Sequence, residues 1–201
     1  DLEILDLRQN QIGDQGAKAI GENEVWRNLI TLDLSSNMLG DEGARSLSTN
    51  KTWIRLEKLH LNSNEISKIE TLSLLCGNNV WKSLKTLRLH ENPTELEEND
   101  VVDLISRLGS QELETLTFSK AIFDRDLLRY LVYSAPKDVL EIPLTDRSYN
   151  ALHASLIGNN ANWIKLKKLD LSKNGLTDEG GRIIAKNNVW TKLEELNLSY
   201  N

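Results

Sequence analysis

The sequence is poor in residues that cross-link a chain or anchor it in a membrane. Its 201 residues include one cysteine, Cys76, and three histidines. One cysteine cannot build the disulfide framework of small secreted domains, which favours a reducing compartment. No signal peptide, lipidation motif or run of about 18 apolar residues is present. We therefore expect a cytoplasmic protein, with a secreted effector as the alternative.

Clustered positive charge is also missing. The chain has 24 Lys and Arg residues against 30 Asp and Glu residues, which gives a formal net charge of −6. Nucleic acids and anionic membranes select proteins with grouped Lys and Arg. We therefore expect neither a nucleic acid nor a membrane as the main partner.

What the sequence does contain is a repeat. The skeleton N-x-x-W-x-x-L-x-x-L-x-L-x-x-N occurs five times and places all five tryptophans at one position: Trp26, Trp53, Trp81, Trp163 and Trp190. Units counted from the first Leu of L-x-x-L-x-L begin at positions 2, 29, 56, 84, 113, 139, 166 and 193, with 26 to 29 residues between starts. A fixed period of this length indicates a solenoid of stacked units.

Each unit combines a strand with a helix. Leu32 and Leu34 alternate with Asp33, as in a strand with one apolar face. A helical period follows, clearest over 12–20, 39–47 and 176–184. The prediction is an α/β leucine-rich repeat solenoid shaped as a horseshoe arc, with a parallel sheet on the concave face and helices on the convex face. We expect one domain over 1–201, as a segment of a longer array or protein.

Asparagine and aspartate mark the turns of the unit. The Asn that closes each strand is expected to bond backbone groups of its turn and of the next unit, forming a ladder of Asn10, Asn37, Asn64, Asn92, Asn174 and Asn201. Asp14, Asp41 and Asp178 occupy expected helix N-cap positions. A second Asn, such as Asn50 or Asn187, falls at the helix end, where left-handed dihedrals are tolerated. Glycines in the Gly-Asp-x-Gly-Ala segments are expected to permit close packing at the helix start.

The pattern L-x-x-L-x-L-x-x-N-x-I-G-D-x-G-A resembles the ribonuclease-inhibitor-like class of leucine-rich repeats. That class includes Ran GTPase-activating proteins and the repeat domains of NOD-like receptors, and its members usually carry an aliphatic residue where this chain has Trp. The resemblance implies a protein-binding scaffold. Its alternatives are a regulator of a small GTPase, for which no arginine-bearing loop can be matched here, and the sensor or effector repeat domain of a larger protein.

The units that begin at 113 and 139 are irregular. Ser110 and Pro136 replace the tryptophan, and Ala121 and Arg147 replace the ladder asparagine. Aromatic residues gather in the same stretch, and aromatics often anchor interfaces. Tyr130 and Tyr133 are therefore candidate protein-binding residues, with packing against the neighbouring leucines as the alternative.

The concave face supplies the other candidates. Outward side chains of neighbouring strands line up in columns. Such columns bring together Asp33, His60, Asn62, Arg88 and His90, with Glu91 at the rim. A metal site could use His60, His90 and Asp33. The two histidines lie on diagonal positions, however, and the sequence indicates no third ligand at close spacing to them. A hydrolase built on Asp33 and His60 lacks a serine at a strained elbow.

We therefore favour a charged contact patch for another protein, anchored by Arg88, because an arginine fork suits interfaces. A solvated face with no partner is the alternative. No phosphate loop is present, because the Gly-Asp-x-Gly-Ala segments follow the period of the fold and lack the Lys and Ser or Thr of that motif. The sequence predicts a non-catalytic scaffold with no cofactor, no metal and no small-molecule substrate.

Overall fold

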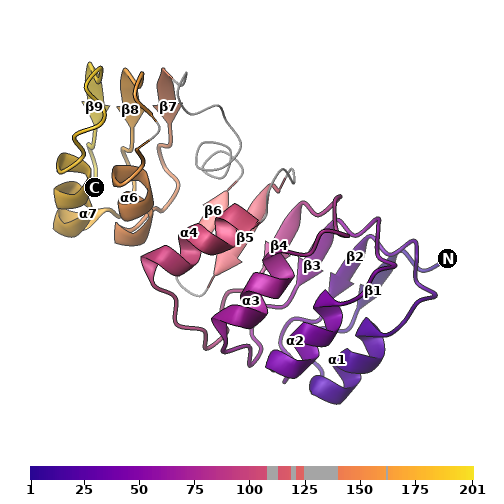
Figure 1. Cartoon of the computed structure of the whole chain (residues 1–201). Coiled ribbons are helices and arrows are strands. Elements are labelled where there is room, and N and C mark those ends of the chain that lie inside the picture. Colours follow the sequence, from indigo (N-terminus) through magenta and orange to yellow (C-terminus); the bar gives the residue numbers. More distant parts are fainter. Residues whose placement is uncertain (108–112, 119–120, 125–139, 162) are drawn as a thin grey trace. The chain divides into compact units, whose positions relative to one another are not determined.

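The computed structural model describes residues 1–107, 113–118, 121–124, 140–161 and 163–201. It divides into two compact units, Asp1–Phe123 (unit 1) and Asp124–Asn201 (unit 2), shown in Figure 1. Each unit stacks strand-and-helix repeats, as an α/β leucine-rich repeat solenoid does. One continuous domain over 1–201 stays a prediction.

Unit 1 alternates short strands with helices. Its elements are β1 (Ile4–Asp6), α1 (Asp14–Gly21), β2 (Thr31–Asp33), α2 (Asp41–Ser48), β3 (Lys58–His60), α3 (Ile69–Cys76), β4 (Thr86–Arg88), α4 (Glu98–Arg107), β5 (Thr115–Phe118) and β6 (Ala121–Asp124). The strands form one sheet in the order β1 to β6, and β1 to β5 pair in parallel. The helices α1 to α4 follow one another along one side of this sheet (Figure 1).

Unit 2 repeats the arrangement on a smaller scale. It contains β7 (Glu141–Pro143), α6 (Ala151–Gly158), β8 (Lys168–Asp170), α7 (Thr177–Ala185) and β9 (Glu195–Asn197). The three strands form a parallel sheet in sequence order, and α6 packs against α7. No helix in the described ranges is both long and apolar enough to cross a membrane.

The strand β6 was not predicted. The repeat pattern places a turn and a helix after β5, whereas the structure has a second strand next to β5 at 121–124. Ala121 stands where regular units have the ladder asparagine. The loss of the ladder asparagine thus coincides with the change from helix to strand after β5.

The register is constant because every strand comes from the same repeat position. Corresponding leucines of successive strands are partners, as Leu32 is to Leu5 and to Leu59. Strand alternation turns these leucines inward, and Leu32, Leu34 and Leu59 are fully buried. Residues between them point to the other side, which none of the described helices α1 to α4 covers. We call this side the open face.

Tryptophans fill the space between helix end and strand. Trp53, Trp81 and Trp163 are fully buried, Trp190 nearly so, and Trp26 is half-buried. Successive rings stack, with centroids 6.5 Å apart for Trp53 and Trp81 and 6.1 Å apart for Trp163 and Trp190. Within unit 1 and within unit 2, each large ring thus continues the core from one repeat into the next.

The ladder asparagines bond backbone groups of their own turn and of the preceding repeat. Bonds to the following repeat were expected instead. Asn37 Oδ1 accepts from the N–H groups of Asn10 and Ile12 at 3.1 and 3.0 Å. Its Nδ2 donates to the carbonyl oxygens of Leu7 and Leu34, both at 3.0 Å. The amide lies on the side where the preceding turn has unpaired backbone groups. Asn64, Asn92, Asn174 and Asn201 make corresponding bonds, whereas Asn10 donates only within its own turn.

The helix-end asparagines form a second ladder. Asn50 Oδ1 accepts from the N–H groups of Thr52 and Trp53 at 2.8 and 3.1 Å, and its Nδ2 donates to the carbonyl of Gly21 at 2.8 Å. These positions do not use the left-handed dihedrals that a helix end tolerates: the C-cap of α2, Thr49, is right-handed with φ −89°, and Asn50 has no positive φ. The side chain pairs the free backbone groups, so no left-handed turn is needed. Asn187 repeats the pattern.

Asp14 and Asp41 each pair backbone N–H groups at the start of the helix in the following repeat. They do not cap the helix of their own repeat. The N-caps of α1 and α2 are glycines, Gly13 and Gly40. Asp14 Oδ1 instead accepts from the N–H groups of Gly40 and Gly43, at 2.8 and 2.9 Å. Asp41 likewise accepts from the first residues before α3, and Asp178 is the second residue of α7. The predicted N-cap roles are therefore wrong, because a carboxylate one position inside the helix reaches the neighbour more easily than its own backbone.

Candidate protein-binding face of unit 1

The open face of unit 1 is built from lines of outward side chains. In-register partners on neighbouring parallel strands lie roughly 4.8 Å apart, so each strand position forms a continuous row. The central row holds Asp6, Asp33, His60, Arg88 and Thr117. One flanking row includes Lys58, and the other includes Arg8, Ser35, Asn62 and His90.

Asp33 is almost fully engaged within the protein. It is 7% exposed and accepts hydrogen bonds from the Ser35 N–H at 2.9 Å, the Ser35 hydroxyl at 2.5 Å and His60 Nδ1 at 3.2 Å. Burial alone would raise its pKa, but these hydrogen bonds outweigh burial and lower the pKa below its ordinary value. Asp33 therefore remains ionised and orients His60. Asp170 and Ser172 form the same contact in unit 2.

His60 lies half-buried beside Asp33. Burial lowers its pKa below the ordinary value, Asp33 opposes that change, and the positive charges of Arg88 and Lys58 add to it. The ring is therefore neutral at pH 7. Because Asp33 is an acceptor only, Nδ1 carries the hydrogen and Nε2 carries the free lone pair.

His90 and Glu91 are each held by a hydroxyl group. His90 Nδ1 lies 2.7 Å from the Thr117 hydroxyl, which also accepts from the Leu89 N–H at 3.2 Å. Glu91 accepts from the Ser63 hydroxyl at 2.5 Å and has a left-handed backbone, with φ 57°. These contacts fix the rim of the face next to Arg88.

Arg88 and Lys58 are the exposed cations of this region. Neither makes a hydrogen bond or an ion pair with a residue in the described ranges, whereas other charges of the sheet are paired. Arg8 bonds Asp6 at 2.6 Å, and Lys85 bonds Glu57 at 2.9 Å. Sequence reasoning missed Lys58, although its signal was available: it lies two residues before His60 in the same strand and so shares its face.

The arrangement does not suit the other chemistries that the sequence raised. In the described part of the chain, no three His, Cys, Asp or Glu residues are grouped as a metal site would need. Asp33 and His60 are paired as in a hydrolase, but the strand position on the other side of His60 is Arg88, not a nucleophile. Burial raises the pKa of Cys76 to about 12, so its thiol stays protonated and unreactive.

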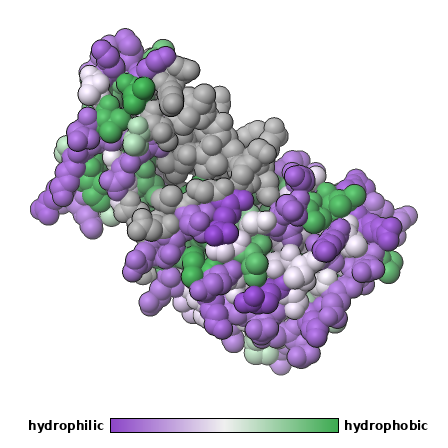
Figure 2. Space-filling model, in the orientation of Figure 1, coloured by the Kyte–Doolittle hydropathy of each residue, from purple (hydrophilic) through white to green (hydrophobic). Residues whose placement is uncertain are grey.

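Tyr130 and Tyr133, the other predicted contact residues, lie outside the described residues. Figure 2 shows hydrophilic residues over most of the visible surface of both units, with hydrophobic residues in smaller patches. The predicted contact residues that the structure does describe are the polar and charged residues of the open face.

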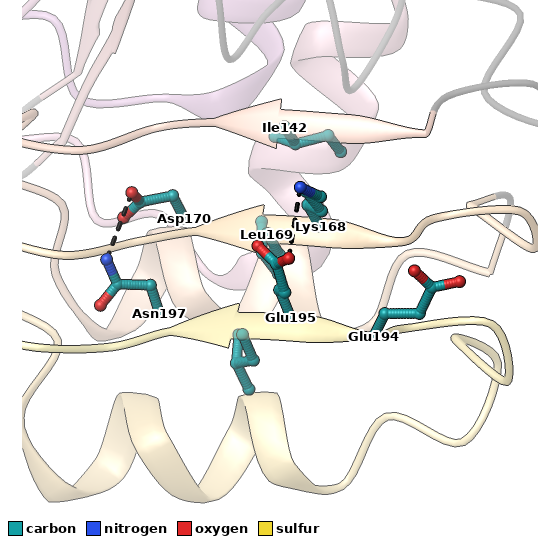
Figure 3. Close-up of a pocket in the computed structure, with 8 residues that line it drawn as sticks. Ile142, Lys168, Leu169, Asp170, Glu194, Glu195 and Asn197 are labelled. Carbon is teal, nitrogen blue, oxygen red and sulfur yellow. Dashed lines mark hydrogen bonds and ion pairs between the residues drawn. The ribbon is translucent and has the colours of Figure 1, made fainter.

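Unit 2 has a shallow hollow on its sheet, drawn in Figure 3, with a volume of about 520 Å³. Its charges are largely satisfied by their neighbours. Lys168 pairs with Glu195 at 3.2 Å, and Asn197 donates to Asp170 at 3.3 Å. Lys168 has the same strand position in unit 2 that Lys58 has in unit 1. The lysine at this position forms an ion pair in unit 2 but has no partner among the described residues in unit 1.

Comparison with known proteins agrees with this architecture. A family model described as "Leucine Rich repeat" matches residues 1–21, 27–48 and 164–185. These three segments are therefore similar to leucine-rich repeats. The ribonuclease-inhibitor-like subclass stays a prediction.

No curated protein matches the sequence. Among solved structures, an internalin from Listeria monocytogenes is similar over all of this chain and 68% of its own, at 18% identity and a TM-score of 0.39. A likeness this weak says nothing about what the present repeats bind.

Proposed function

We propose that this protein is a non-catalytic scaffold that binds another protein through the open face of unit 1, with Arg88 at the centre of the contact. Leucine-rich repeat proteins generally act as scaffolds for protein interactions. The observation that carries the proposal is the state of Arg88: its guanidinium is exposed and has no partner in the described ranges, on a sheet whose other charges are mostly paired.

The surroundings of Arg88 suit a contact surface. His60 lies opposite it in register, and Asn62 and His90 belong to the adjoining row. Their ring and amide groups can donate and accept hydrogen bonds along an extended partner segment. Asp33 and Glu91 remain predicted contact residues; Asp33 also bonds His60, and Glu91 also accepts from the Ser63 hydroxyl.

The fold favours binding because the face is ordered before a partner arrives. Two asparagine ladders and a constant register fix each strand relative to the next. A surface that is already ordered loses little conformational entropy on binding. That the partner is a protein, and not a nucleic acid, membrane or small molecule, is part of the proposal.

The test is affinity capture from native lysate followed by mapping on the complex. We expect Arg88→Glu to lose the partner and Arg45→Glu, on the exposed side of α2, to keep it. Hydrogen exchange of the wild-type complex should show protection in β2 to β4. A partner lost only with Tyr130→Ala/Tyr133→Ala would place the contact elsewhere and contradict the proposal.

A further inference from the structure

We propose that the open face of unit 1 recognises a carboxylate, namely an acidic side chain of an extended protein segment, between Lys58 and Arg88 and over His60. This inference rests on the proposed function and specifies the chemistry of the partner.

The open face of unit 1 carries a local excess of positive charge. Asp6 is neutralised by Arg8, whose Nε and Nη2 both bond the carboxylate, at 2.9 and 2.6 Å from Oδ2. Asp33 is occupied by Ser35 and His60. Lys58 and Arg88 therefore leave two positive charges without a partner among the described residues. The whole chain carries a net charge of −6, so this local excess is opposite in sign to the protein as a whole.

Lys58, His60 and Arg88 are neighbours on this face. Arg88 lies opposite His60 on the neighbouring strand, and Lys58 lies two residues before His60 on its own strand and face. The imidazole thus has Arg88 as its neighbour across the sheet and Lys58 as its neighbour along its own strand. An arginine fork binds a carboxylate through two parallel hydrogen bonds, and a lysine adds a mobile point charge. A carboxylate at this place would contact all three side chains.

The proton on His60 makes binding of a carboxylate depend on pH. Its Nδ1 donates to Asp33, so in the neutral ring the other nitrogen, Nε2, carries the free lone pair. A carboxylate there meets a repulsive lone pair unless Nε2 takes up a proton. Binding should therefore be coupled to proton uptake, and affinity should rise as the pH falls.

The groups around His60 agree with that sign. Asp33, and Asp6 more weakly, favour the protonated ring, while Lys58 and Arg88 disfavour it. Arg8, just after β1, is engaged with Asp6 and also lies 4.0 Å from Asp33 Oδ2, and His90, just after β4, is engaged with Thr117. A bound carboxylate offsets the two opposing cations and leaves Asp33 to stabilise the imidazolium.

Unit 2 provides the contrast that makes the inference specific. Lys168 has the strand position of Lys58, and Asp170 has the position of His60. There the lysine is already paired with Glu195 at 3.2 Å, and the central residue is an anion. The same fold therefore carries one face prepared for a carboxylate and one that is already neutralised.

The experiment titrates the protein with a capped peptide of alternating Ser and Glu and, as control, the same peptide with Gln in place of Glu. Binding is followed through the ¹H and ¹³C signals of the His60 ring at about pH 5.5 and about pH 7.5, on either side of the ordinary histidine pKa. We expect the Glu peptide alone to raise the pKa of His60 and to bind more tightly at the lower pH. Lys58→Gln and Arg88→Gln should each weaken binding about tenfold, and Lys168→Gln should leave it unchanged.

Equal binding of the Gln peptide, or an equal loss with Lys168→Gln, would overturn the inference, as would affinity independent of pH. Its failure differs from failure of the proposed function. If the captured native partner is lost with Arg88→Glu but is not displaced by the Glu peptide or weakened by Lys58→Gln, the face binds a protein that does not present a carboxylate. If the native partner ignores Arg88→Glu, the proposed function itself fails.

Discussion

The carboxylate of Asp14, in α1, accepts a hydrogen bond of 2.9 Å from the backbone N–H of Gly43, in α2. The same oxygen accepts from the Gly40 N–H at 2.8 Å. Free N–H groups at the start of one helix are thus paired by a side chain of the preceding repeat. The first N–H groups of such a helix find a partner only when the preceding repeat is stacked against it. The stability of each repeat therefore depends on stacking.

Replacing Asp14 tests this capping between units. Asp14→Ala should lower the free energy of unfolding by about 1 kcal/mol, because α2 loses its cap. Asp178 has the same repeat position but accepts no hydrogen bond from a described residue, so Asp178→Ala should cost less than about half as much. Urea unfolding followed by tryptophan emission measures both. Equal losses would show that Asp14 acts only through its charge.

Two adjacent glycines of α7 should respond in opposite directions to alanine. A Cβ at Gly180 would lie 2.9 Å from Leu176 Cβ and 3.2 Å from Ala154 Cβ, whereas a Cβ at Gly181 meets no atom within 4 Å. We expect Gly180→Ala to destabilise the protein by about 1–3 kcal/mol through overpacking. Gly181→Ala should stabilise it by about 0.5–1 kcal/mol because alanine favours the helix. Thermal unfolding of the two variants is the measurement, and a loss for both would argue against the helix contact.

The second asparagine ladder can be tested at Asn50. Asn50→Asp keeps the oxygen that accepts from Thr52 and Trp53 but removes the donor to Gly21 and Asn23. A buried carboxylate would then face two carbonyl oxygens, at a cost of about 3 kcal/mol. Asn188→Asp, at an exposed position, is the control and should change stability by less than about 0.5 kcal/mol. Denaturant midpoints distinguish the two, and a tolerated Asn50→Asp would mean that the amide donor contributes little.

Stability should depend on the proton of His60. Its pKa is lower in the folded protein than the unfolded value near 6.5, so between these two values the unfolded chain binds more protons. The stabilising contribution is complete above about pH 6.5 and is lost as the pH falls through the folded pKa. His60→Asn should remove this part of the pH dependence. Urea unfolding at several pH values measures it, and a wild type that gains stability on acidification relative to His60→Asn would contradict the assignment.

The rows of the open face could be predicted in part. Strand alternation and the repeat period placed Asp33, His60 and Arg88 side by side, and the pairing of β2, β3 and β4 has that register. The same alternation also turns Lys58 outward, which sequence reasoning overlooked. Which charges are paired could not be predicted, because side-chain rotamers decide whether Arg88 or Arg8 reaches a carboxylate.

By itself, the sequence determined the repeat, the strand alternation and the stacking of helices on one side of a parallel sheet, because each unit must bury the same leucine face. It did not determine where the polar groups of the turns find partners. The bonds of Asn37 to the preceding turn, of Asp14 to α2 and of Asn50 to the preceding helix end join residues 25 or more positions apart. Only the tertiary structure decides such contacts, since they depend on the offset between neighbouring units and not on the pattern within one.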